Sequence, residues 1–99
     1  MTYRNQKLLN LARGQACVMC GCQDGTIVSA HSNLLEHGKG KGIKAHDGMI
    51  SWLCMRCHTN LDQGSTMSKQ ERREFILESI CKTYMQMWDK ELIQVKGSK

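Results

Sequence analysis

The chain has 99 residues without a proline, of which 40% are hydrophobic, and this fits one small globular domain over residues 1–99. Lys and Arg number 14 against 9 Asp and Glu, and the formal net charge of +5 favours an acidic partner such as nucleic acid. Residues 1–7 lack the apolar segment of a signal peptide, and no apolar run could span a membrane. We therefore expect a cytoplasmic protein rather than a secreted or membrane one.

The first half of the chain predicts one helix, one strand and a long loop. Apolar residues at helical spacing predict a helix over residues 3–13, and Gly14 stands just past its end. The short β-branched run at residues 26–31 predicts a strand that ends at His31. Residues 32–44 are rich in glycine and basic residues and predict a mobile loop.

The second half predicts a strand followed by helices. The strand is expected over residues 49–53, and a short helix over residues 55–62 is expected to end at Gly64. A capping box at residues 68–71 predicts the start of a long helix that runs to about Asp89.

Five apolar residues at helical spacing predict the buried face of this long helix: Leu77, Ile80, Tyr84, Met87 and Trp88. Cys81 lies in the same pattern and is expected to be a small apolar core residue. A last strand is expected over residues 92–96.

Two Cys-x-x-Cys turns are the most specific motif in the chain. Such turns each present two thiolates, and two of them complete a tetrahedral zinc site. The expected ligands of this structural Zn²⁺ are Cys17, Cys20, Cys54 and Cys57. A redox site would need one pair in a βαβ context, which the pattern lacks. Cys22 lies two residues after Cys20 and offers an alternative fourth ligand.

Two histidines and an aspartate form a second candidate group. His31 ends the first strand, and His58 follows Cys57 directly. On a helix of 3.6 residues per turn, Cys57 and His58 point about 100° apart, whereas His58 and Asp62 share a face. The pair could bind one metal ion. Alternatively, His58 lies beside the zinc or on the surface, and Asp62 is a solvated charge.

The basic loop offers a candidate phosphate-binding segment. Gly and Lys alternate from Gly38 to Gly42, an arrangement that lets amides and ammonium groups approach a phosphate backbone. The candidate contacts are Lys39, Lys41 and Lys44, with His37 and His46 as surface residues or further phosphate contacts. The order of residues differs from a nucleotide P-loop. A solvated flexible loop is the alternative.

Taken together, these residues resemble the HNH, or ββα-metal, endonucleases, and most closely the small prophage-encoded nucleases of the YbcO type. The similarity covers most of the chain. The motifs that carry it are Arg13-Gly14 before the first cysteine, Cys17-x-x-Cys20, Ala30-His31, Asp47, Leu53-Cys54-x-x-Cys57-His58 and a closing amphipathic helix. The resemblance implies an α+β fold, a zinc-stapled treble-clef or ββα-metal domain with an N-terminal helix and a long C-terminal amphipathic helix.

The same resemblance implies the roles of the site residues. His31 would be the general base, His58 a ligand of a catalytic Mg²⁺ or Mn²⁺, and Asp62 a second ligand four residues later. Asp47 stands at the family's Asn position and would orient the base, or bind the ion itself. Ala30 departs from the metal-binding Asp or His that many members have.

The function that the resemblance implies is metal-dependent hydrolysis of DNA phosphodiester bonds, in phage or prophage DNA processing or recombination in a bacterial cytoplasm. The partner would be nucleic acid, and no membrane. The main alternative is a non-catalytic treble-clef zinc module that binds nucleic acid or protein. A thiol-redox or zinc-storage protein is a third reading.

Overall fold

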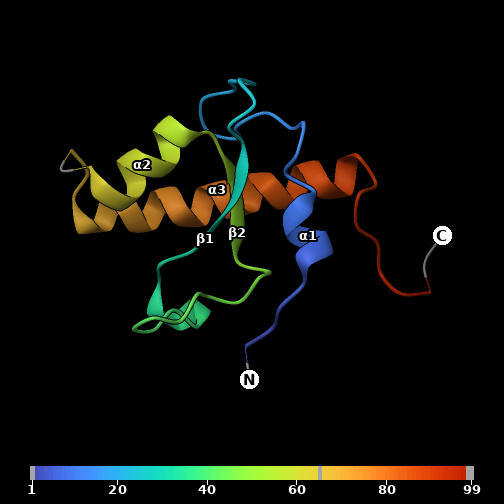
Figure 1. The fold of residues 1–99 in the computed structure, drawn as a ribbon, viewed down its shortest axis with the longest axis horizontal. Coiled ribbons are helices and arrows are strands. Elements are labelled where there is room, and N and C mark those ends of the chain that lie inside the picture. Colours follow the sequence, from blue (N-terminus) through green and yellow to red (C-terminus); the bar gives the residue numbers. More distant parts are fainter. Residues whose placement is uncertain (1, 65, 98–99) are drawn as a thin grey trace.

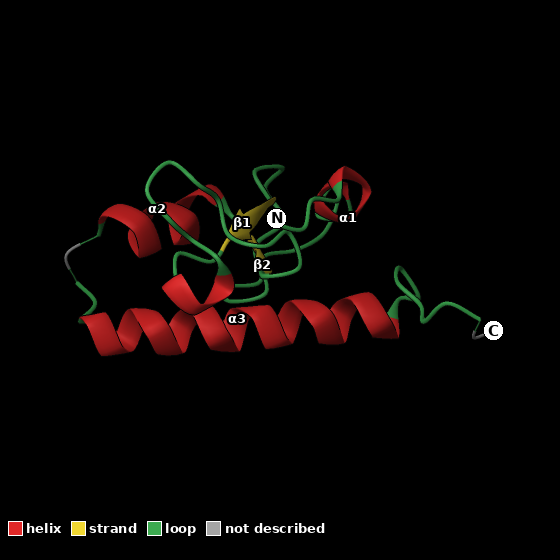
Figure 2. Cartoon of the chain, turned by 90° about the horizontal axis from the view of Figure 1, so that it is seen from below, coloured by secondary structure: helices red, strands yellow, loops and turns green. Residues whose placement is uncertain are grey.

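The computed structural model describes residues 2–64 and 66–97 and shows a small α+β fold. Its elements in chain order are α1 (Gln6–Asn10), β1 (Val28–His31), the 3₁₀ helix η1 (Leu35–His37), β2 (Ile50–Leu53), α2 (Met55–Gln63) and α3 (Lys69–Asp89). The long helix α3 forms one layer, and the two strands with α1 and α2 lie on one side of it (Figures 1 and 2). No helix within the described residues is both long enough and apolar enough to cross a membrane.

The two strands form one antiparallel pair, in which Val28 lies opposite Leu53 and His31 opposite Ile50. All four residues of β2 are buried, because this strand packs against α3 on one side and carries β1 on its edge. Both strands begin within two residues of their predicted positions. The antiparallel register places the end of β1 beside the start of β2, so α2, which follows the end of β2, begins near the start of β1.

Helix α3 begins at the predicted capping box. The amide of Glu71 donates to Ser68 Oγ at 3.1 Å, and the amide of Ser68 donates to Glu71 Oε1 at 2.9 Å. Two orphan amides of the first turn are thus satisfied, and the helix ends at Asp89 as predicted.

The buried face of α3 agrees with the prediction in part: Ile80 and Met87 are buried, and Tyr84 packs partly buried against the core. Leu77 and Trp88 are 37% and 48% exposed, and Cys81, predicted to lie in the core, is exposed. The buried residues of the helix are Ile76, Ser79, Ile80, Thr83 and Met87.

Two short polar residues explain this orientation of α3. Ser79 Oγ lies 2.7 Å from Ser51 Oγ, and Thr83 Oγ1 accepts from the amide of Trp52 at 3.0 Å. Small side chains at these positions let the helix approach β2 closely, and their hydrogen bonds satisfy polar groups that burial would otherwise leave unpaired. The stripe of large apolar residues therefore turns partly towards solvent.

The other short elements follow the prediction in part. Helix α1 covers only Gln6–Asn10 of the predicted 3–13, because residues 2–5 are extended, with Asn5 as the N-cap. Gly14 ends the turns after α1 with φ of +79°, a left-handed conformation that favours glycine. Helix α2 ends at Gly64 as predicted, and the Gly64 amide donates to Asn60 O at 3.1 Å.

Two segments carry structure that the sequence did not predict. Residues 32–44, predicted as a loop, contain η1 and a tight turn in which Gly40 and Ile43 exchange both backbone hydrogen bonds at 3.1 Å. The last strand, predicted over residues 92–96, is wrong, because that part of the chain forms turns and no strand. The Leu92 amide instead donates to Met87 O at 2.9 Å, which folds the chain back on the end of α3.

Candidate functional site

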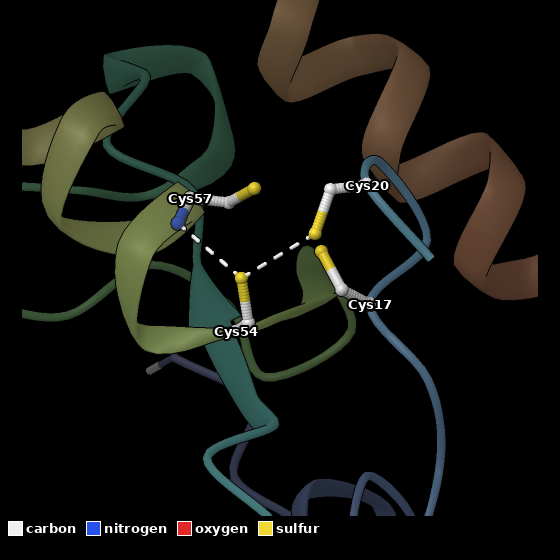
Figure 3. Close-up of side chains that lie close together, drawn as sticks. All are labelled: Cys17, Cys20, Cys54 and Cys57. Atoms are coloured by element: carbon white, nitrogen blue, oxygen red, sulfur yellow. Dashed lines mark hydrogen bonds between the residues drawn. The ribbon is translucent and has the colours of Figure 1, made fainter. Parts of the chain in front are cut away.

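Four cysteine sulfurs lie together on one side of β2, and they form a possible structural zinc site (Figure 3). The Sγ atoms of Cys17, Cys20, Cys54 and Cys57 all lie within 4.8 Å of one another, and those of Cys20 and Cys54 are 3.6 Å apart. Tetrahedral zinc with Zn–S bonds of about 2.3 Å separates its sulfurs by roughly 3.8 Å. The donor set and its spacing therefore fit this ion.

The backbone builds each half of the cluster from a tight turn. In the first turn, the Gly21 amide donates to Cys17 O at 2.9 Å, and Gly21 adopts φ of +80°. In the second, Cys54 is the N-cap of α2, and its sulfur accepts from the Cys57 amide at 3.4 Å. The Val18 amide donates to Trp52 O at 3.0 Å, which attaches the first turn to the strand that leads into the second.

The pKa values of the cysteine thiols indicate that this cluster needs a cation to hold all four sulfurs as thiolates. Hydrogen bonding from the Cys22 amide is the largest influence on Cys20 and lowers the pKa of its thiol to about 6. Burial raises the pKa of Cys57 far above its usual range. Four thiolates cannot all ionise so close together without a compensating charge, and a divalent metal supplies one.

Cys22, the alternative ligand, lies outside the group of four sulfurs. Burial is the largest of the influences that raise the pKa of its thiol to about 12. The geometry favours Cys20 as the fourth ligand.

A cleft of about 680 Å³ lies between β1, α2 and the loop that joins the strands. Three of the predicted site residues line it: His31 from the end of β1, and His58 and Asp62 from α2. Lys39 and Lys44 line the same cleft from the loop. The structure thus brings together a histidine, a histidine–carboxylate pair and two cations that are far apart in the sequence.

Helix α2 directs consecutive residues to different sites, as the helical period predicts. Cys57 faces the other sulfurs, whereas His58 faces the cleft. His58 Nε2 lies 3.0 Å from Asp62 Oδ2, one turn along the helix, and both side chains are partly exposed. Ala30 also lines the cleft but offers no ligand atom.

The structure shows no cluster of three potential ligands in the cleft. Within residues 2–64 and 66–97, the four cysteines are the only such group of His, Cys, Asp or Glu. His58 and Asp62 therefore offer a divalent ion two protein ligands. Mg²⁺ and Mn²⁺ favour carboxylate and water ligands together with substrate phosphates, so Asp62 fits these ions, whereas the imidazole of His58 is a ligand more typical of transition metals.

Asp47 contacts His31 but does not itself line the cleft. Its side chain is buried and contacts His31 Nε2 through Oδ1 at 2.7 Å. Burial by itself raises the pKa of this carboxyl, but hydrogen bonds from His31, the Asn5 amide and Arg4 outweigh burial and hold the pKa below its usual value. Its oxygens are therefore committed to these three donors, and the alternative in which Asp47 binds the ion does not fit.

Because ionised Asp47 only accepts hydrogen bonds, Nε2 of His31 must carry the imidazole proton. In the neutral form of this imidazole, Nδ1 carries the free lone pair. Nδ1 has no hydrogen-bond partner among the described residues. Among these residues, the one buried side-chain nitrogen or oxygen without a partner is Trp52 Nε1, so Nδ1 of His31 is not fully buried. Nδ1 therefore reaches solvent, in a residue that lines the cleft.

The remaining candidates lie elsewhere. Lys41 does not line the cleft. His37 contacts Ser32 Oγ through Nδ1 at 2.7 Å, and His46 stacks on Tyr3 with ring centroids 4.7 Å apart. Sequence reasoning missed Arg4, because nothing in the local pattern signals a contact with a residue 43 positions away.

Comparisons of the chain with protein-family models, with curated proteins and with solved structures find no match.

Proposed function

We propose that the chain is a metal-dependent DNA endonuclease of the HNH class that hydrolyses phosphodiester bonds. The observation that carries this proposal is the cleft that His31, His58 and Asp62 share with Lys39 and Lys44. Its elements follow the order strand, strand, helix that the resemblance implies. A base, a cation-binding pair and phosphate-binding charges are the groups that cleavage of a phosphodiester needs.

We also propose that the four cysteines bind a structural Zn²⁺, separate from the catalytic ion. The four sulfurs, all within 4.8 Å of one another, supply the number of ligands that closed structural sites use. Since Cys57 and His58 are adjacent, a zinc that orders the start of α2 also fixes the helix that carries His58 and Asp62. The zinc module of this proposal is a treble clef.

In the proposed reaction, Nδ1 of His31 takes a proton from the attacking water. Asp47 accepts the Nε2 proton's hydrogen bond at 2.7 Å and stabilises the imidazolium that forms. Lys39 and Lys44 hold the phosphate backbone over the cleft. A divalent ion at His58 and Asp62 would, when bound, stabilise charge on the leaving oxygen.

Plasmid nicking by the zinc-loaded protein with Mg²⁺, Mn²⁺ or EDTA tests the proposal. We expect nicking with a divalent ion, its loss in EDTA, and its loss in His31→Ala with DNA binding retained. Asp89→Ala, which removes an exposed carboxylate at the end of α3 and outside the cleft, is the control and should cut at the wild-type rate. DNA binding without cleavage under every ion would instead support the non-catalytic zinc module.

A further inference from the structure

The extended segment at residues 2–5 crosses the loop at residues 44–47, which connects to β2 behind the cleft. Arg4 Nη1 donates to Ala45 O at 2.6 Å and to Asp47 Oδ1 at 2.8 Å, and Arg4 Nη2 donates to Lys44 O at 2.8 Å. One guanidinium therefore binds both the backbone of this loop and its buried carboxylate. The proposed reaction assigns no role to Arg4 or to these three contacts.

The backbone of the same segment pairs with Asp47 from both directions. The Asn5 amide donates to Asp47 Oδ2 at 2.6 Å, and the Asp47 amide donates to Tyr3 O at 3.1 Å. Asn5 is also the N-cap of α1, because its side chain accepts from the Leu8 amide at 3.1 Å. The segment is thus held in place next to Asp47 rather than lying loosely over it.

Arg4 and His31 share one oxygen of Asp47. Oδ1 accepts from Arg4 Nη1 at 2.8 Å and from His31 Nε2 at 2.7 Å, and the Asp47 side chain is only 3% exposed. A carboxylate buried to this extent remains charged only when a cation and hydrogen-bond donors compensate for the lost water. Of the three groups that donate to it, Arg4 is the one that always carries a full positive charge.

We infer that Arg4 is a positioning residue for the cleft, which keeps Asp47 ionised against His31 and thereby leaves Nδ1 of His31 free to act on a ligand. Arg4 itself does not line the cleft: it acts through Asp47, and it also holds the backbone of Lys44, which does line the cleft. Only the kinetic test of this inference rests on the proposed function. The inference itself concerns the charge of the Asp47 carboxyl and the position of the proton on the His31 imidazole.

NMR spectroscopy of the zinc-loaded full chain tests this inference without any substrate. In the wild type, the ¹³C shift of the Asp47 carboxyl should report a pKa below the usual range, and the ¹⁵N shifts of His31 should show Nε2 protonated and Nδ1 not. In Arg4→Met, the pKa of Asp47 should rise and the Nε2–H signal should broaden by faster exchange with water. An Asp47 that titrates in Arg4→Met as in the wild type would overturn the inference.

Three further variants separate charge from the support of the loop. Arg4→Lys keeps the positive charge but loses the planar fork that reaches Asp47 and two carbonyls, and it should restore the low pKa of Asp47. Arg4→Gln, which is neutral but can still donate to a loop carbonyl, covers the case in which Arg4→Met fails to fold, because the pKa of Asp47 should rise in it as well. Arg73→Met removes the same charge from an exposed pair with Glu36 and should leave Asp47 unchanged. A low pKa of Asp47 in Arg4→Met or Arg4→Gln would mean that Arg4 only holds the loop, which refutes the inference.

Kinetics provide the second readout. Arg4→Met should lower kcat about 10- to 100-fold, the typical cost of losing a group that supports a functional histidine from outside the site. Arg4→Lys should recover most of this loss, and Arg73→Met should match the wild type. An unchanged kcat in Arg4→Met, beside an active wild type, refutes the inference. A wild type that cuts no DNA but shows the expected NMR behaviour refutes the proposed function and leaves the inference standing.

Discussion

At the level of single residues, the proposed roles of His31 as the base and Asp62 as a metal ligand can be separated by experiment. In the proposed reaction Asp62 is a ligand of the divalent ion, so Asp62→Ala should raise the Mg²⁺ or Mn²⁺ concentration for half-maximal cleavage, by roughly 10-fold or more. His31→Ala removes the proposed base and should lower the rate at saturating ion by about 10²- to 10⁴-fold. Ion titrations of cleavage by each variant measure both effects.

Asp89→Ala is the matched control for this pair, because it removes an exposed carboxylate at the far end of α3. It should leave both parameters unchanged. Thermal unfolding should change little in Asp62→Ala and Asp89→Ala, whose side chains are exposed, whereas His31→Ala removes a hydrogen bond to buried Asp47 and should lower the melting temperature. If excess ion restores full activity to His31→Ala, His31 acts on the ion and is not the base.

Among the elements, the two cysteine turns should depend on the metal as a unit. Cys54 supplies a buried sulfur and caps α2, so Cys54→Ser should release the zinc and unfold the chain. Structural zinc contributes about 10–16 kcal/mol in small zinc domains, which is comparable with the total stability of a domain this size. Elemental analysis after dialysis, together with circular dichroism, measures both results.

Cys22→Ser is the control for the cluster, because Cys22 lies beside the four sulfurs but outside their group. It should retain one zinc per chain and the wild-type spectrum. Zinc loss in Cys22→Ser, with retention in Cys20→Ser, would reassign the fourth ligand.

Adjacent residues on α3 test how this helix is rotated against the sheet. Ile76 is 2% exposed and Leu77 is 37% exposed. Ile76→Ala leaves a cavity in the core and should cost about 2–5 kcal/mol of unfolding free energy, whereas Leu77→Ala should cost under about 1 kcal/mol. Chemical denaturation of the two variants, both zinc-loaded, makes the comparison. Equal losses would mean that Leu77 is buried against something other than solvent.

At the scale of the whole molecule, a net charge of +5 predicts DNA binding that weakens with salt, and the cleft identifies which lysines contribute. Lys39 and Lys44 line the cleft, so replacing both with Ala should reduce the log–log slope of affinity against salt by about 0.9 for each lost phosphate contact. Lys41→Ala, from the same loop but outside the cleft, should change the slope less. Fluorescence anisotropy with duplex DNA over a range of salt concentrations measures all three slopes.

An equal change of slope for Lys41→Ala would show that the loop binds DNA by its charge alone. An unchanged slope in the double variant would return residues 39–44 to a solvated loop.

The sequence allowed much of the molecule to be predicted where the signal is local. The Cys-x-x-Cys spacing, the capping box at Ser68 and the β-branched runs all act within a few residues, and the elements they predict are present. The separation of Cys57 from His58 followed from the period of one helix. These features needed no knowledge of what packs against them.

The features that could not be predicted depend on contacts between distant segments. Arg4 meets Asp47 across 43 positions, and no pattern in either segment announces it. The buried face of α3 is decided by Ser79 and Thr83, whose hydrogen bonds to β2 outweigh the larger apolar stripe at Leu77 and Trp88. The last strand failed because the chain after α3 turns back on the helix end instead of pairing with another strand.

Because Cys57 and His58 are adjacent, a spectroscopic probe in the cysteine site would lie next to the cleft. Zinc has a filled d shell and absorbs no visible light, but cobalt held by four sulfurs is coloured, and its spectrum responds to small changes of coordination geometry. A rigid, planar peptide unit joins the two residues, so a tilt of one is passed to the other. In a cobalt-loaded chain, the visible absorption spectrum should therefore change when a divalent ion or DNA binds at the neighbouring cleft.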